Sequence, residues 1–164
     1  MSQAIFLAVI VTTVAFLIIS FGTDLRERMI YVFPCIMLTL SWGLMGLVGV
    51  HDMAFVMTII LLHMFVFSLM RILKIWGDGD SDMFLLYGAV YAAYAIPVLG
   101  THQMCSYFIG EIIGLMVALI ISLVIGFIEA RIKKQRMEKG SSIAVVPGFA
   151  VVMIALIIMT LFKR

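Results

Sequence analysis

Six long apolar runs, joined by short polar connections, dominate this sequence of 164 residues. An apolar run of about 18 or more residues is long enough to cross a bilayer as an α-helix. Hydrophobic residues make up 65% of the chain and charged residues 12%, whereas a soluble domain carries roughly 25% charged residues. We therefore expect an all-α polytopic membrane protein, a bundle of six transmembrane helices forming a single membrane-embedded domain. The expected spans cover about residues 3–22, 30–50, 53–73, 83–100, 106–129 and 143–162.

The basic residues are distributed unevenly among the connections. Lys163 and Arg164 lie at the C-terminal end, and the connections after the first, third and fifth runs hold the other nine. By the positive-inside rule these three connections are expected in the cytoplasm, with both termini outside. The formal net charge of +2 gives no support to nucleic-acid binding. The nine residues are Arg26, Arg28, Arg71, Lys74, Arg131, Lys133, Lys134, Arg136 and Lys139.

The stretch KIWGDGDSD, residues 74–82, concentrates acidic residues in the connection between the third and fourth runs. Asp24, at the end of the first run, is expected at the same cytoplasmic depth. Asp52 and Glu111 lie toward the outside. The acidic residues of the 74–82 stretch are Asp78, Asp80 and Asp82.

Two carboxylates that face each other at one membrane depth can activate a water molecule. At roughly 4 Å and an effective dielectric constant near 20, two such charges repel by about 4 kcal/mol, so near neutral pH the pair tends to hold one shared proton. One carboxyl group then acts as a base toward water while the other donates a proton to the scissile carbonyl. Gly77 and Gly79 fit this chemistry, because glycine allows a peptide to approach the backbone closely.

Two short motifs resemble the type IV prepilin peptidases, the G-x-G-D aspartyl proteases of membranes. Their usual pattern in the first cytoplasmic loop is D-x-x-x-x-x-I-P-N. Asp24 and Ile30 match it with the same spacing, whereas Tyr31 and Val32 replace the proline and asparagine.

The second motif of that family is G-x-G-D-x-K. Gly77, Gly79 and Asp80 match it, and Asp82 replaces the lysine. The family often has a proline near the start of its last span, and Pro147 is similar.

The resemblance implies an aspartic endopeptidase with Asp24 and Asp80 as its catalytic pair and with no metal or cofactor. It would cleave the basic leader from pilin, pseudopilin or archaellin precursors at the cytoplasmic membrane face. The implied partners are a membrane-inserted precursor, with a basic leader and a hydrophobic helix, and the lipid bilayer.

Three further acids stand beside the expected pair: Glu27, Asp78 and Asp82. They either draw in the basic leader or are solvated loop charges. The first run is expected to be a retained helix rather than a secretory signal, since it lacks a basic segment before it and a small-residue cleavage site before Asp24. Because no C-x-x-C motif is present, the resemblance is to peptidase-only members without the methyltransferase segment.

Two other functions remain open: a small cation-linked membrane transporter and a noncatalytic membrane assembly protein. Transporters usually place ionisable groups near the membrane midplane, whereas the acids here cluster at one face. His63 is the midplane exception, and we expect a neutral histidine hydrogen-bonded between helices.

The remaining small and sulfur-containing residues predict packing rather than chemistry. Cys35 and Cys105 are expected at opposite membrane depths, which excludes a disulfide between them. Gly110 and Gly114 form a G-x-x-x-G pattern that favours close contact between helices.

Overall fold

The computed structural model describes residues 3–27, 29–48, 50–74, 77–132 and 144–162. All regular structure in these residues is α-helical, which confirms the all-α class expected from the sequence. The helices are α1 (Gln3–Glu27), α2 (Val32–Leu47), α3 (Met53–Ile72), α4 (Asp78–Leu99), α5 (Met104–Ile132) and α6 (Val146–Phe162).

Four of these helices, α1, α3, α4 and α5, are long and apolar enough to cross a membrane. α2 and α6 are equally apolar in character but shorter, at 16 and 17 residues. At about 1.5 Å per residue such a helix is about 24–26 Å long, against a hydrocarbon core of about 30 Å. The structure therefore supports a multi-pass membrane protein with four full-length candidate spans and two shorter apolar helices.

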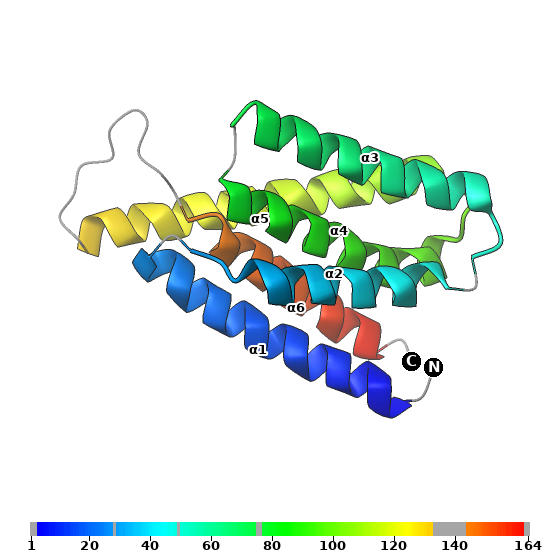
Figure 1. Ribbon diagram of the computed structural model, residues 1–164, viewed down its shortest axis with the longest axis horizontal. Coiled ribbons are helices and arrows are strands. Elements are labelled where there is room, and N and C mark those ends of the chain that lie inside the picture. The colour runs from blue at the N-terminus through cyan, green and yellow to red at the C-terminus, as the bar shows by residue number, and fades with distance from the viewer. Residues whose placement is uncertain (1–2, 28, 49, 75–76, 133–143, 163–164) are drawn as a thin grey trace.

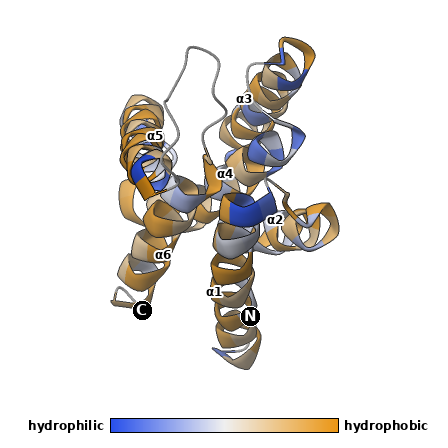
Figure 2. Cartoon of the chain, turned by 90° about the vertical axis from the view of Figure 1, so that its left-hand side faces the viewer, coloured by the Kyte–Doolittle hydropathy of each residue, from blue (hydrophilic) through white to orange (hydrophobic). Residues whose placement is uncertain are grey.

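The helices run alternately up and down the bundle, so that connections alternate between its two ends (Figure 1). α1, α3 and α5 end where α2, α4 and α6 begin, and α1 begins at the end where α6 finishes. Figure 2 looks onto the first of these ends, where hydrophilic residues gather while the helix bodies are hydrophobic. Arg26, Arg71, Lys74 and Arg131 lie at this end. Arg28, residues 133–139, Lys163 and Arg164 lie outside the described residues.

α4 is the central helix, and 13 of its 22 residues are buried. From Met83 onward its sequence is mostly apolar around the whole circumference, which is typical of a helix enclosed by others. Small residues let the neighbours come close: a Cβ atom added at Gly46 of α2 would lie 2.8 Å from the backbone nitrogen of Ala93 on α4. The largest buried side chains around α4 include Trp42, Tyr87 and Tyr107.

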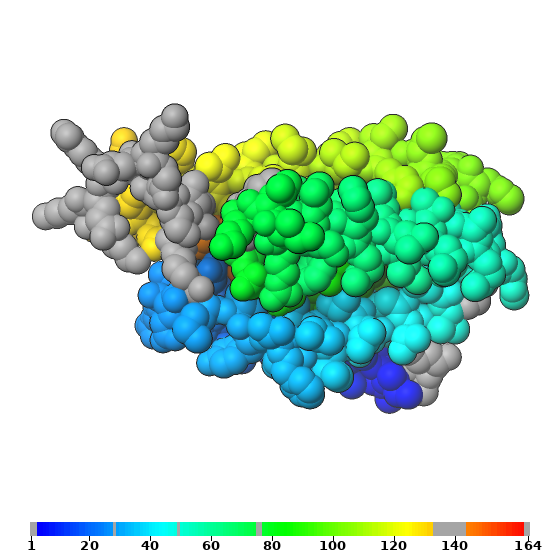
Figure 3. All heavy atoms as spheres, turned by 45° about the horizontal axis from the view of Figure 1, so that its top comes forward, coloured from blue at the N-terminus to red at the C-terminus, as the bar shows by residue number. Residues whose placement is uncertain are grey.

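α3 lies at the periphery. Figure 3 shows it on the surface, between α5 on one side and α2 on the other. Only four of its 20 residues are buried, and three of them, Phe55, Ile59 and His63, follow one another at four-residue intervals. That spacing places them on one helix face, the face that packs against the bundle.

The two cysteines and the two glycines of the G-x-x-x-G pattern lie in different surroundings. Cys35 is buried and Cys105 exposed, and both are free, as expected. Gly110 and Gly114 do face a neighbouring helix, but the atoms that occupy the space of their missing side chains are the hydroxyls of Tyr91 and Tyr87 on α4. The close contact is therefore between glycine and tyrosine rather than between two helix backbones.

Candidate carboxylate site

Asp24 lies within α1, which continues past the expected end of the first span to Glu27. Its side chain is buried, with 5% of the residue exposed. The backbone N–H of Val146 donates a hydrogen bond to Asp24 Oδ2 over 3.3 Å. The first N–H groups of a helix lack hydrogen-bond partners within the helix. The Asp24 carboxyl group supplies such a partner and so stabilises the start of α6. Pro147 follows in the first turn of α6, where proline is tolerated.

The three acids of the 74–82 stretch lie in α4, not in a loop as the sequence analysis expected. Gly77 is the N-cap, with an extended backbone (φ −61°, ψ 158°), and the helix begins at Asp78. The Ser81 hydroxyl and backbone N–H both donate to the Gly77 carbonyl. Acidic residues in the first turn interact favourably with the positive end of the helix dipole. This favourable interaction explains why α4 begins five residues before the apolar run that starts at Met83.

Asp80 is half-buried on this first turn. A Cβ atom added at Gly77 would lie 3.2 Å from Asp80 Oδ2, so the carboxyl group folds back toward the N-cap. A side chain at Gly77 would crowd it.

The two short motifs meet in the structure. A Cβ atom added at Gly79 would lie 2.8 Å from Cδ1 and 3.2 Å from Cβ of Ile30. Ile30, in the connection between α1 and α2, therefore packs directly on the backbone of α4 beside Asp80. Asp24, near the end of α1, and Asp80, in the first turn of α4, lie at the same end of the bundle, on two helices that both pack against α6.

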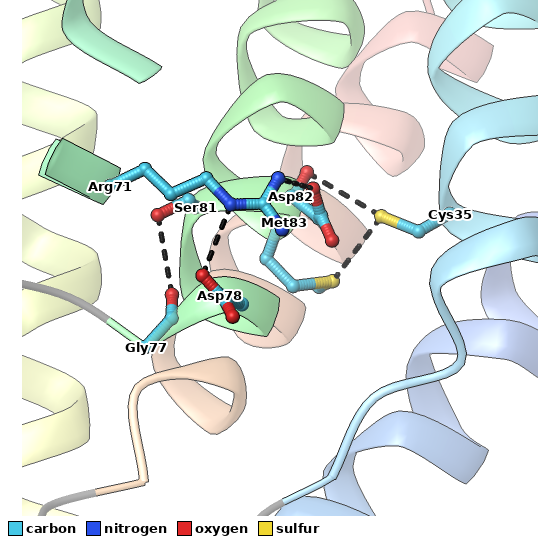
Figure 4. Close-up of polar contacts among 7 residues, drawn as sticks. All are labelled: Cys35, Arg71, Gly77, Asp78, Ser81, Asp82 and Met83. Carbon is cyan, nitrogen blue, oxygen red and sulfur yellow. Dashed lines mark hydrogen bonds and ion pairs between the residues drawn. The ribbon is translucent and has the colours of Figure 1, made fainter. Parts of the chain in front are cut away.

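Asp82 is not a solvated loop charge, which was one of the two alternatives for this residue. Only 5% of it is exposed, and its Oδ2 has no hydrogen-bond partner within the described part of the chain. Its Oδ1 lies 4.0 Å from Nη1 of Arg71, and its backbone carbonyl accepts a contact of 3.4 Å from Sγ of Cys35 (Figure 4). A buried carboxylate is costly unless it is paired, so Arg71 offsets part of that cost.

Arg71, at the end of α3, also holds Asp78. Its Nε donates to Asp78 Oδ1 over 3.0 Å, and both side chains are largely exposed (Figure 4). Glu27 is exposed at the end of α1 and lines a shallow depression with Thr23 and Tyr31. Of the three accessory acids, Asp78 is therefore paired on the surface, Asp82 is buried, and Glu27 faces solvent.

One pair of ionisable residues was missed by the sequence analysis. Nε2 of His63 lies 2.5 Å from Oε1 of Glu111, and both residues are buried. His63 is hydrogen-bonded between helices, as expected, but its partner is an acid that the analysis had assigned only to the outer side. A single acid inside an apolar run was the available signal, because such residues are rare in membranes and usually functional.

Metal binding finds no support in this geometry. Within the described ranges, no three His, Cys, Asp or Glu side chains gather closely enough to hold an ion. No protein-family model, curated protein or solved structure matches the chain.

Proposed function

We propose that this protein is a membrane aspartic endopeptidase that uses Asp24 and Asp80 to cleave the basic leader from prepilin-like precursors. The observation that carries the proposal is the contact between Ile30 and Gly79. It joins the segment that follows Asp24 to the helix start that bears Asp80, so that both motifs contribute to one end of the bundle. Asp24 adds support, because its buried carboxyl group lies at the start of α6, at the same end of the bundle as Asp80.

The proposed chemistry is hydrolysis by a shared-proton pair. One carboxyl group accepts a proton from water as the water oxygen adds to the scissile carbonyl carbon, and the other protonates the carbonyl oxygen. The peptide C–N bond then breaks: the pair protonates the leaving amine, one hydroxyl group of the tetrahedral intermediate returns its proton to the pair, and the carbonyl carbon ends as a carboxylic acid that ionises in water. The pair titrates as a unit, so the single proton belongs to both residues.

The substrate would present its leader at the same membrane depth as the pair. A precursor with a hydrophobic helix can insert beside the bundle while its basic leader stays in the aqueous phase. We place this end of the bundle in the cytoplasm, because Arg26, Arg71, Lys74 and Arg131 lie there. Labelling of a cysteine introduced at Lys74, in a Cys105→Ser background, with an impermeant thiol reagent tests the orientation: reaction from outside intact cells would reverse it.

The activity test replaces each proposed catalytic residue by its amide. Asp24→Asn and Asp80→Asn should each reduce cleavage of a co-expressed precursor by about 10²–10⁴-fold, the range attributed to general acid–base groups. Asp52→Asn is the matched control. Asp52 caps α3 at the opposite end by accepting from the Phe55 N–H, a role that asparagine retains. Full cleavage by both site variants would refute the proposal.

Substitution of Glu27 tests separately whether this acidic residue helps to bind the basic leader of the substrate. It is exposed, and an exposed ion pair contributes about 0.2–1 kcal/mol, which corresponds to a factor of about 1.4–5. Glu27→Gln should therefore raise KM for a Lys/Arg-rich leader by that factor at low salt and leave kcat unchanged. The difference should shrink as salt rises. An unchanged KM at every ionic strength would identify Glu27 as a solvated charge only.

Cation-linked transport is the second candidate, and one observation favours it. The buried pair of His63 and Glu111 places ionisable groups inside the bundle, which corrects the expectation that His63 stands alone there. Glu111→Gln separates the two functions in reconstituted vesicles. A transporter would lose cation flux, whereas a peptidase would keep cleaving its precursor. A noncatalytic assembly protein would show neither activity, with or without the substitution.

A further inference from the structure

His63 reaches its partner across the central helix. A Cβ atom added at Gly88 of α4 would overlap Nε2 and Cδ2 of the imidazole ring, so the ring lies directly over the α4 backbone. Phe84, one turn earlier, stacks on the ring at a centroid distance of 5.6 Å and an interplanar angle of 23°. On the far side of Gly88 the ring meets Glu111 of α5. The imidazole is thus held in one orientation between three helices.

The hydrogen bonds of the ring determine how many protons the pair holds. Nδ1 lies 2.8 Å from the carbonyl oxygen of Ile59. A carbonyl only accepts, so Nδ1 carries a hydrogen atom. Nε2 and Glu111 Oε1, 2.5 Å apart, therefore share a single proton, either as imidazolium and carboxylate or as imidazole and carboxylic acid. Both forms are neutral overall, which suits a membrane interior.

In the part of the chain that the structure describes, few other titratable side chains lie near His63 and Glu111. From α4 and α5 the nearby titratable side chains are three tyrosines, and those of Tyr87 and Tyr91 donate to the backbone carbonyls of Glu111 and Tyr107. The third, the hydroxyl of Tyr107, is buried without a partner in the described residues. α2 contributes Thr39 but no titratable group to the adjoining cavity.

The pair lies between two apolar cavities, one on each side of α3. A cavity of about 270 Å³ lies between α3 and α5 and is lined by Leu62, Phe108 and Ile112 besides the pair. A second cavity, of about 460 Å³, lies between α2 and α3, and His63 and Gly88 contribute to its wall. α3 is thus flanked by cavities and joined to α5 through this hydrogen bond.

We propose that His63 and Glu111 form a proton-binding site within the membrane that holds α3 on the bundle while it carries one shared proton. A second proton leaves an imidazolium beside a neutral carboxylic acid, an unpaired charge in an apolar environment. Loss of the shared proton places a carboxylate against the lone pair of Nε2. Both changes weaken the link, so α3 is held most tightly at intermediate pH.

Movement of α3 would change the candidate carboxylate site. Arg71, two turns beyond His63 on the same helix, binds Asp78 and approaches Asp82 at the start of α4. Displacement of α3 would withdraw this guanidinium from both carboxylates. The proton site itself is independent of the proposed peptidase activity, and its test requires no substrate.

The test measures exposure of the α3 face that packs on the bundle. Val56, buried on α3, is replaced by cysteine, and the protein in lipid vesicles is treated with a membrane-permeant maleimide over a range of pH. The exposed native Cys105 is the internal reference for the pH dependence of the thiol reaction. Met53→Cys, at an exposed position in the first turn of α3, gives the upper limit of reactivity.

The reactivity of the Val56→Cys thiol relative to that of Cys105 should be lowest at intermediate pH. It should rise about 5-fold or more at lower and at higher pH, the low end of typical coupling between sites. In the double variant His63→Gln/Glu111→Gln, two amides keep a hydrogen bond without a titratable group, and the profile should be flat. A flat profile in the protein with native His63 and Glu111 would overturn the proposal. So would a double variant that retains the minimum, because the pH dependence would then originate elsewhere.

Discussion

The contact between α2 and α4 leads to a sharp prediction, because two glycines on α2 stand in opposite surroundings. A Cβ atom at Gly46 would lie 2.8 Å from the backbone nitrogen and 3.0 Å from the Cα atom of Ala93, whereas one at Gly43 would meet nothing within 4 Å. A backbone cannot rotate away as a side chain can. Gly46→Ala therefore forces α2 and α4 apart, and Gly43→Ala does not.

The expected magnitudes follow from these distances. Replacing glycine by alanine inside a helix stabilises it by up to about 1 kcal/mol, a gain open to both variants. Overpacking typically costs about 1–3 kcal/mol, and only Gly46→Ala incurs it. The free energies of unfolding of the two variants should therefore differ by about 1–3 kcal/mol, with Gly43→Ala the more stable.

The assay is reversible unfolding in mixed micelles of increasing denaturing-detergent fraction. Trp42 is fully buried on the same helix, so its fluorescence reports separation of α2 from the bundle. A Trp76→Phe background leaves it as the only indole. Equal unfolding midpoints for Gly43→Ala and Gly46→Ala would refute the close approach of α2 and α4.

Two further pairs of substitutions test contacts within the bundle. Thr13→Val should cost about 1–3 kcal/mol in unfolding free energy, because it leaves the buried indole N–H of Trp42 without its 2.8 Å acceptor. Thr12→Val, at an exposed position whose hydroxyl bonds only to carbonyls of its own helix, should stay within about 0.5 kcal/mol in the same assay. Gly79→Ala should lower both stability and precursor cleavage, and Ile30→Ala in the same chain should recover about 0.5–3 kcal/mol of the stability loss in a double-mutant cycle. Strict additivity of these two changes would mean that the motifs do not touch.

The apolar runs predicted the helical class and the number of helices well, because a long apolar segment in a bilayer must satisfy its backbone internally. The ends of the helices were predicted less well. The apolar pattern predicts that the fourth span begins at about residue 83, whereas α4 begins at Asp78. Hydropathy does not predict a helix start at a glycine N-cap followed by acidic residues, although acidic residues in the first turn stabilise a helix. α2, expected over 30–50, is shorter for the opposite reason: apolar residues continue beyond the last helical turn.

The acidic cluster and the family resemblance singled out Asp24, Asp80 and the two glycines as candidate site residues, and their catalytic role stays a prediction. The structure brings the two segments that contain them into contact at Ile30 and Gly79. Sequence could not show that Asp82 is buried or that Arg71 approaches it. These two residues belong to different helices, and only the packing of those helices decides which acid of a cluster faces solvent.

Composition and the length of the apolar runs suffice to identify a helical membrane protein, because both are properties of each segment alone. Which helix is central and which polar groups meet depend on how the helices pack. α3 and α4 are both apolar, yet α4 is enclosed and α3 lies at the periphery. His63 and Glu111 are 48 positions apart in the sequence, and the residues between them contain no local signal for their pairing. It arises because Gly88 leaves room for an imidazole ring over α4, and that space exists only when three helices are packed together.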